Sequence, residues 1–173
     1  DKSDIVQVLR DIATLLEYHG EGPFKCRAYE TAAGALADEA APLADLLGAE
    51  GRLERVKGIG KSIAATIREI ASTGASTYHQ ELLSGAPAGL QQLLRVPGLG
   101  VKKVRLLHEK LGVGSVEELE EVCRSGAIEL VPGFGSKSIE RLFHGIEMQR
   151  RHAGQWLYPV AFSRAEELVV ELL

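Results

Sequence analysis

The stretch "VPGLGVKKV", residues 96–104, combines a hydrophobic residue, a proline, two glycines one residue apart and two lysines. The same arrangement returns as "VKGIGKSIA" at 56–64 and, with one lysine, as "VPGFGSKSI" at 131–139. Each copy is followed by a segment that reads as a helix, so each Gly-x-Gly is expected to open one. Glycine can adopt positive φ and lets another backbone approach closely, which suits a tight turn between two helices. The repeat predicts three helical hairpins.

The rest of the chain also favours helices. Apolar residues recur at helical spacing along 4–20, and Pro23 suits the first turn of an alanine-rich helix that follows. Ser115 stands three residues before Glu118, which is the spacing of a capping box. Aromatic residues make up only 5% of the chain, and no segment alternates convincingly with a period of two. The predicted fold class is therefore all-α.

Positive charge is concentrated around the glycine segments. The net charge is −4, which by itself would disfavour binding to nucleic acid. Residues 52–68, however, contain five basic residues and one acidic residue, and 95–105 contain four basic residues and none that is acidic. The acidic residues collect mainly in 37–45 and 117–121. This distribution indicates anion binding at the hairpins, with ordinary clustering of surface charge as the alternative.

A helix that starts at such a turn exposes unpaired amide groups at the positive end of its dipole, and phosphate is the commonest anion of suitable shape. Contacts of this kind read no base, so the expected ligand is the sugar-phosphate backbone of DNA, without sequence preference. A nucleotide-binding G-x-G-x-x-G loop is excluded because its third glycine is replaced by Ile63, Lys103 or Ser138. Apolar neighbours are expected to pack each turn, namely Val56 and Ile63, Val96 and Val104, and Val131 and Ile139. The predicted DNA-binding residues of the hairpins are Gly58, Gly60, Lys61, Ser62, Gly98, Gly100, Lys102, Lys103, Gly133, Gly135 and Lys137.

The three units resemble the helix-hairpin-helix motif of DNA repair and replication proteins. Together with "GEGPFKCRAYETAAGAL" at 20–36, they resemble the amino-terminal half of a family X DNA polymerase of the bacterial type, from about residue 4 to the end. The resemblance implies a polymerase-beta-like helical domain with the first hairpin at 1–84, a primer-side hairpin domain at 85–154, and the start of a palm domain at 155–173.

The function implied is that of a DNA-binding module in base excision repair. The module would hold gapped, nicked or 5′-phosphorylated DNA while a palm domain not contained in this chain fills the gap. Cys26 and Cys123 have no disulfide or metal-ligand pattern, and no apolar run reaches membrane-spanning length, so we expect a cytoplasmic protein. We also expect it to be a monomer. A stand-alone, non-catalytic hairpin protein that binds DNA or a protein is the alternative.

The resemblance also assigns individual residues. Lys25 and Tyr29 match residues that contact the 5′-phosphate, and Phe24 matches an aromatic that stacks on the template base, with core packing as the alternative for Phe24 and Tyr29. The hairpins of the family often hold Na⁺ or K⁺ through backbone carbonyls. Here these carbonyls would belong to Glu54, Val56 and Ile59 in the first hairpin, and to Leu94, Val96 and Leu99 in the second.

Two departures from the family limit the chemistry. The position of the lyase nucleophile, six residues after Gly60, holds Thr66, whose hydroxyl cannot form an imine. Lys61 or Lys25 would have to substitute for it, so lyase activity is not expected. The paired carboxylates that bind Mg²⁺ belong to the palm, of which 158–173 resembles only the first helix. No catalytic residue is predicted, and the five histidines are expected to be satisfied surface residues.

Overall fold

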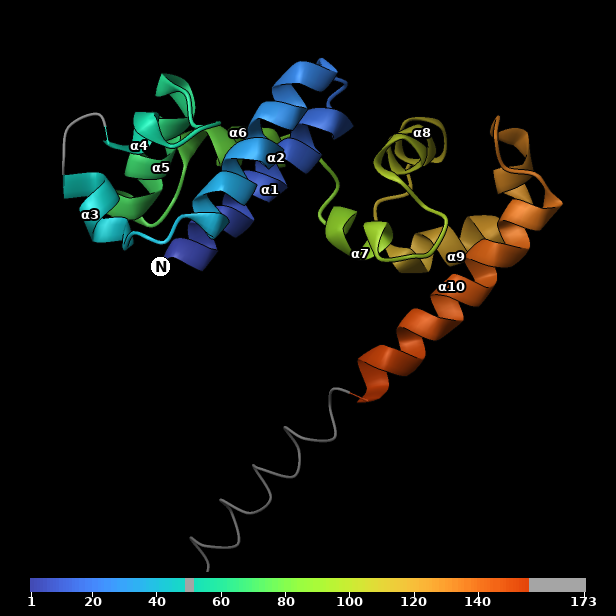
Figure 1. Ribbon diagram of the computed structural model, residues 1–173. Coiled ribbons are helices and arrows are strands. Elements are labelled where there is room, and N and C mark those ends of the chain that lie inside the picture. The colour runs from blue at the N-terminus through green and yellow to red at the C-terminus, as the bar shows by residue number, and fades with distance from the viewer. Residues whose placement is uncertain (49–51, 156–173) are drawn as a thin grey trace, which may run out of the picture. The chain divides into compact units, whose positions relative to one another are not determined.

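The computed structural model describes residues 1–48 and 52–155, and these residues form helices and turns without any strand (Figure 1). The prediction of an all-α fold is confirmed. The chain divides into two units, the first covering Asp1–Pro87 and the second beginning at Ala88. The predicted start of a palm domain lies, apart from its first residue, outside the described residues.

The first unit is built on two long helices joined by a short turn. The first begins after Asp1, whose carboxylate accepts the amides of Ser3 and Asp4 in a capping box. The second begins at Pro23, as expected for a residue that lacks an amide hydrogen. The helices of this unit are α1 (Lys2–Tyr18), α2 (Pro23–Asp38), α3 (Leu43–Gly48), α4 (Arg52–Arg55), α5 (Lys61–Thr73) and α6 (Thr77–Ser84).

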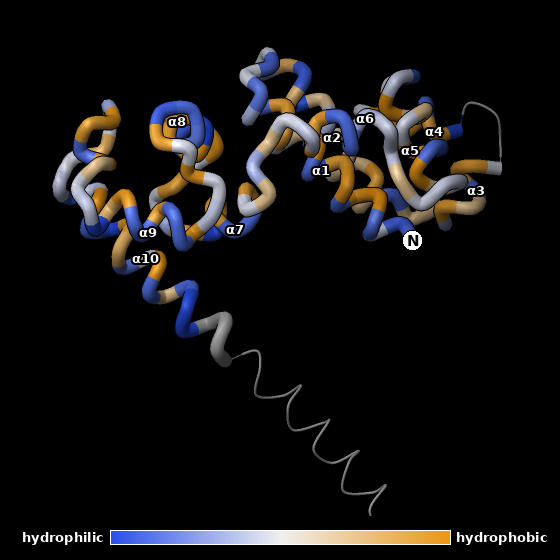
Figure 2. The backbone as a smooth tube through the Cα atoms, turned by 180° about the vertical axis from the view of Figure 1, so that it is seen from behind, coloured by the Kyte–Doolittle hydropathy of each residue, from blue (hydrophilic) through white to orange (hydrophobic). Residues whose placement is uncertain are grey.

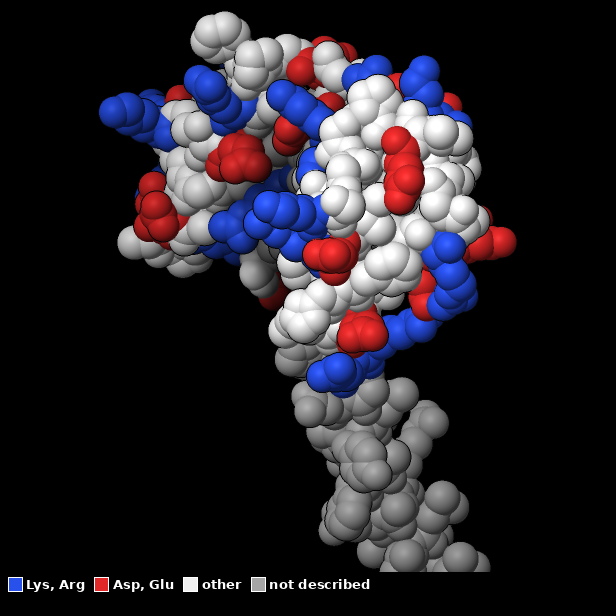
Figure 3. Space-filling view, turned by 90° about the vertical axis from the view of Figure 1, so that its right-hand side faces the viewer, with Lys and Arg blue, Asp and Glu red and all other residues white. Residues whose placement is uncertain are grey.

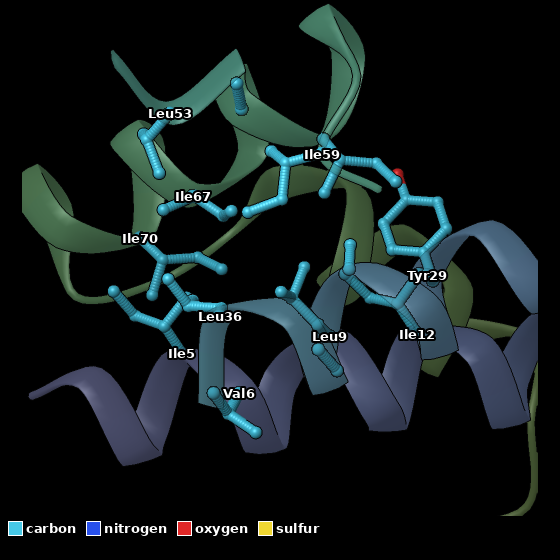
Figure 4. Close-up of a cluster of buried hydrophobic side chains, with 14 of the residues drawn as sticks. Ile5, Val6, Leu9, Ile12, Tyr29, Leu36, Leu53, Ile59, Ile67 and Ile70 are labelled. Atoms are coloured by element: carbon cyan, nitrogen blue, oxygen red, sulfur yellow. The ribbon is translucent and has the colours of Figure 1, made fainter. Parts of the chain in front are cut away.

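The core of the first unit lies between the α1–α2 pair and the hairpin formed by α4 and α5 (Figure 4). Leu9 and Ile12 of α1 are fully buried, and so is Ile67 of α5. Burying a side chain of this size contributes about 1.5–3 kcal/mol. The first hairpin is therefore packed against the α1–α2 pair.

The second unit contains the other two hairpins and the longest helix. Its elements are α7 (Leu90–Leu94), α8 (Val101–Leu111), α9 (Val116–Arg124), the 3₁₀ helix η1 (Ala127–Leu130) and α10 (Ser136–Gln155). The predicted capping box is present, because the Ser115 side chain accepts the Glu118 amide and the Glu118 carboxylate accepts the Ser115 amide. The Glu120 carboxylate of α9 accepts hydrogen bonds from Arg124 and from Arg150 of α10, which fixes α10 to α9.

Hydrophobic and hydrophilic residues alternate along the helices of both units (Figure 2). This pattern lets each helix bury one face and expose another. Within the described ranges, no helix combines the length and the apolar character that crossing a membrane would require.

The histidine of α6 does not match the prediction. His79 of α6 is partly buried, and its Nε2 atom is buried without a hydrogen-bond partner among the described residues. Burial lowers the pKa of its imidazole, and the nearby Asp11 carboxylate opposes that shift. His79 is therefore part of the α1–α6 packing and not a satisfied surface residue.

Candidate nucleic-acid interface

The three hairpins share one pattern of backbone hydrogen bonds. In each hairpin, the valine two residues before the first glycine donates its amide hydrogen to the carbonyl three residues earlier. The residue between the glycines donates its amide hydrogen to the carbonyl of that valine. The carbonyl of the second glycine accepts a hydrogen bond from the amide four residues later, as in an α-helix. In the first hairpin these bonds are Val56–Leu53 (3.1 Å), Ile59–Val56 (3.0 Å) and Ala64–Gly60 (2.9 Å). In the second they are Val96–Leu93 (3.1 Å), Leu99–Val96 (3.1 Å) and Val104–Gly100 (3.0 Å). In the third they are Val131–Ile128 (3.1 Å), Phe134–Val131 (3.3 Å) and Ile139–Gly135 (3.1 Å).

The two glycines of each turn have different roles. The first glycine has positive φ, +100° at Gly58, +87° at Gly98 and +90° at Gly133. The second is extended, with φ −82° and ψ 169° at Gly60 and φ −94° and ψ 169° at Gly100. Only the first glycine is therefore required by backbone conformation. A Cβ atom at Gly60 or Gly100 would meet nothing within 4 Å, so the space beside the start of the helix is open.

Buried side chains lie on the inner side of each turn. Three equivalent positions are buried in all three hairpins: Leu53, Leu93 and Ile128; Ile59, Leu99 and Phe134; Ala64, Val104 and Ile139. The expectation that apolar neighbours pack the turns is confirmed in general. In the first hairpin the position equivalent to Val104 is Ala64, while Ile63 is buried beside it.

The starts of α5 and α8 are open to solvent. Their N-cap residues, Gly60 and Gly100, make no side-chain hydrogen bond to the first amides of the helix. Both glycines are exposed. Uncapped amides at the positive end of a helix dipole form a site for an anion such as phosphate.

Basic and hydroxyl side chains stand beside these helix starts. Lys61, Ser62, Lys102 and Lys137 are exposed. Lys103 differs, because its Nζ atom donates to the Gly98 carbonyl (3.3 Å) and lies 5.3 Å from the centre of the Phe134 ring. Its charge is therefore fixed beside the turn of the second hairpin.

Two arginines of the basic segments are engaged by carboxylates. Arg68 makes a two-pronged ion pair with Glu54 (2.8 and 2.9 Å), and this pairing lowers the pKa of the Glu54 carboxyl. Arg105 pairs with Glu109 at 2.7 Å. The charge available to a ligand is thus smaller than the sequence indicates. The basic side chains gather in clusters among scattered carboxylates (Figure 3).

A groove of about 820 Å³ lies beside the first hairpin, between α2, α5 and α6. The side chain of Lys25 projects into it, with Nζ 3.1 Å from a Glu21 oxygen and 5.6 Å from the centre of the Tyr78 ring. A hydrogen bond with Tyr78 and then the bond with Glu21 raise the pKa of Lys25. The groove is also lined by Tyr29, Gly58, Gly60, Lys61, Ser62 and Thr66. A cationic, hydroxyl-lined groove next to open amides can accept a terminal phosphate.

The aromatic residues at the start of α2 have separate environments. Phe24 is 84% exposed, which rules out core packing for this side chain within the first unit. Tyr29 is 6% exposed, and burial raises the pKa of its hydroxyl, while a hydrogen bond with Thr66 opposes that shift. Tyr29 is thus both a core residue and part of the groove wall.

Thr66 occupies the wall of the groove and is almost fully buried. Its hydroxyl donates to the Ser62 carbonyl at 3.3 Å. Tyr78 and Glu69 also line the groove, although no pattern in the sequence indicated a role for them. Glu69 accepts hydrogen bonds from the amide and hydroxyl of Thr77, which tie the start of α6 to α5. Ser76, which caps α6, is the signal in the sequence that could have located this helix.

The carbonyls expected to hold a monovalent cation belong to equivalent turns. Val56 and Val96 each already accept one amide hydrogen, from Ile59 and Leu99 respectively. A carbonyl oxygen has two acceptor positions, so one remains for a cation. The described residues contain no group of three or more His, Cys, Asp or Glu side chains that could hold a metal ion.

Comparison with known proteins agrees with this geometry. Residues 1–76 match the family described as a helix-hairpin-helix domain, and residues 90–145 match the SAM-like helix-hairpin-helix tandem. The chain is 32% identical over 186 aligned positions to the DNA polymerase/3′-5′ exonuclease PolX of Bacillus subtilis. That match covers 96% of this chain and 32% of the relative, so the chain spans about a third of the relative's length. Both units of the chain thus match helix-hairpin-helix families, and the resemblance of the chain to a bacterial family X DNA polymerase is confirmed.

Proposed function

We propose that this chain is the sequence-independent DNA-binding module of a family X repair polymerase. It grips gapped or nicked DNA by its backbone phosphates, as a monomer in the cytoplasm. The gap is filled by a palm domain that the described residues do not include. Mg²⁺ belongs to that palm domain and has no role in the hairpins.

The observation that carries this proposal is the repeated turn with open amides. The first glycines share a positive φ, and α5 and α8 both begin without a side-chain cap. Exposed Lys61 and Lys102 lie in the first turns of these helices. Phosphate binding by amides and lysines carries no base readout, so the module acts on DNA of any sequence.

The groove of the first unit supports binding of a 5′-phosphate. Lys25 is held there by Tyr78 and Glu21, and exposed ion pairs of the Lys25–Glu21 kind contribute little, so a phosphate can replace the carboxylate. Phe24 lies on the same helix and is exposed, which would leave its ring available to stack on an unpaired base.

Lyase chemistry is not part of this proposal. A lysine nucleophile needs a lowered pKa to be neutral, whereas the pKa of Lys25 is raised. Thr66 offers only a buried hydroxyl at the position of the family's nucleophile.

The backbone carbonyl oxygens of the turns are suitable ligands for Na⁺ or K⁺. Hard cations prefer oxygen ligands, and the Val56 and Val96 carbonyls each keep one acceptor position beside the amide hydrogen that they accept. The cation would neutralise a phosphate at the turn. The ligands would be the carbonyls of Glu54, Val56 and Ile59 in one hairpin, and of Leu94, Val96 and Leu99 in the other.

Titration of the 173-residue chain against blunt, nicked and one-nucleotide-gapped duplexes tests the proposal. The gap should be prepared with either a 5′-phosphate or a 5′-hydroxyl, and binding followed by fluorescence anisotropy. We expect the 5′-phosphorylated gap to bind about tenfold more tightly, since one charge-assisted hydrogen bond contributes about 1.5–3 kcal/mol.

The variant Lys25→Ala should remove this preference, because its charge lies in the groove. The variant Lys102→Ala belongs to the second hairpin and should weaken binding to both gapped substrates equally. Equal affinity of the wild-type chain for the phosphate and hydroxyl forms would contradict a 5′-phosphate site around Lys25.

A further inference from the structure

A glycine in the middle of α10 lies directly behind the second hairpin. Gly145 is buried, although glycine is less favourable than alanine in a helix interior. A Cβ atom there would lie 2.8 Å from Cδ of Pro97, 3.2 Å from Cγ1 of Val96 and 3.3 Å from the backbone nitrogen of Pro97. The proline ring and the backbone cannot move aside by changing a rotamer. The absence of a side chain at 145 therefore sets how closely α10 approaches the turn.

Two more contacts join the same pieces of chain. Phe134, in the third hairpin, lies under the ammonium of Lys103, which in turn donates to the Gly98 carbonyl. Gln149 of α10 donates from Nε2 to the Gln92 carbonyl of α7 at 3.1 Å. The third hairpin and α10 thus contact all three parts of the second hairpin: its first helix, its turn and its second helix.

The first hairpin has a corresponding support from a different element. A Cβ atom at Gly58 would lie 2.9 Å from Cγ2 of Thr31 in α2, so α2 backs that turn. In the first unit the glycine at this contact, Gly58, belongs to the turn. In the second unit the glycine, Gly145, belongs to the supporting helix. In both units, close approach of a separate helix determines the position of the turn.

We propose that α10 positions the phosphate-binding turn of the second hairpin, and that Gly145 is the positioning residue. This inference rests on the proposed function, because it assigns to the third hairpin and α10 the task of holding the second hairpin in its DNA-binding conformation. A side chain at 145 separates α10 from Val96 and Pro97, and the amides that follow Gly98 lose their alignment.

The test compares Gly145→Ala with Gly34→Ala in the 173-residue chain. Gly34 is also inside a long helix, α2, but a Cβ atom there meets nothing within 4 Å, so it provides a matched control. We expect Gly145→Ala to lower the affinity for gapped DNA about tenfold, equivalent to one charge-assisted hydrogen bond. Gly34→Ala should bind as the wild type does. Circular dichroism should show both variants to be helical.

Three further measurements separate positioning from a general loss of structure. The amide NMR signals of Gly98, Leu99 and Gly100 should shift in Gly145→Ala, while those of Gly58 and Gly60 should not. The preference for a 5′-phosphate, which belongs to the first unit, should be unchanged. Adding Pro97→Ala should restore part of the affinity, because it removes the Cδ atom in the closest contact, and the first hairpin forms the same turn with Lys57 at that position.

The outcomes are distinguishable. Wild-type chain that fails to bind DNA contradicts the proposed function. Wild-type chain that binds DNA no more tightly than Gly145→Ala contradicts only the positioning role. Loss of the 5′-phosphate preference in Gly145→Ala, or no recovery in the double variant, also overturns it.

Discussion

The substitution Gly98→Val is expected to lower the affinity for gapped DNA about 10- to 100-fold, which corresponds to the loss of about one charge-assisted hydrogen bond. Gly98 has φ +87°, a conformation that a β-branched residue strongly disfavours. A Cβ atom at this position meets no protein atom within 4 Å, so the valine side chain would project from the turn. We expect it to obstruct a phosphate that approaches the open amides. Anisotropy titration at constant salt measures the effect.

Gly112→Val is the matched control for this substitution. Gly112 has φ +70° and equally open surroundings, but it follows the carboxyl end of α8, away from the open amides. Both variants should lose about 1–2 kcal/mol of stability from backbone strain. Only Gly98→Val should lose affinity for DNA. Similar losses of affinity in the two variants would mean that strain, and not the phosphate site, is responsible.

Replacing Lys102 and Lys103 together should change the salt dependence of binding. Each lysine that neutralises a phosphate contributes about 0.9 to the slope of log affinity against log salt concentration. The double variant should therefore have a slope about 2 units shallower, and the change should be the same for DNA of any sequence. Titrations at four or more salt concentrations between about 50 and 200 mM give the slope.

Lys110→Ala controls for the loss of charge as such. Lys110 is exposed and lies in the last turn of α8, whereas Lys102 and Lys103 lie in its first turn. Its removal should leave the slope unchanged. A slope that falls equally in Lys110→Ala would show that overall charge, and not charge at the helix start, determines binding.

The hairpins could be predicted from sequence because their signals are local. The Gly-x-Gly spacing, Pro23 at a helix start and the Ser115–Glu118 capping box each act over a few residues, and the structure contains all of them. The different roles of the two glycines could not be predicted, because both positions hold the same residue type. Only backbone geometry separates the positive φ of Gly58 from the extended Gly60.

Features that depend on distant residues were not visible in the sequence. Arg68 is paired with Glu54, fourteen positions away, so a count of basic residues overestimates the free charge. Tyr78 reaches Lys25 only because α6 packs beside α2 and α5. From the sequence alone, Gly145 is simply an unfavourable residue inside a helix. Its close contacts with Val96 and Pro97 explain why no larger side chain fits there. Tertiary contacts decide such positions, and local patterns do not encode them.

The most direct test of the account measures how the affinity of the wild-type chain for DNA depends on salt. About four lysine or arginine contacts with phosphates should give a slope of about −3 to −4 for log affinity against log salt concentration, for duplexes of unrelated sequence alike. Failure to bind any duplex at low salt, or binding whose affinity does not change with salt, would contradict the claim that the hairpins grip the DNA backbone.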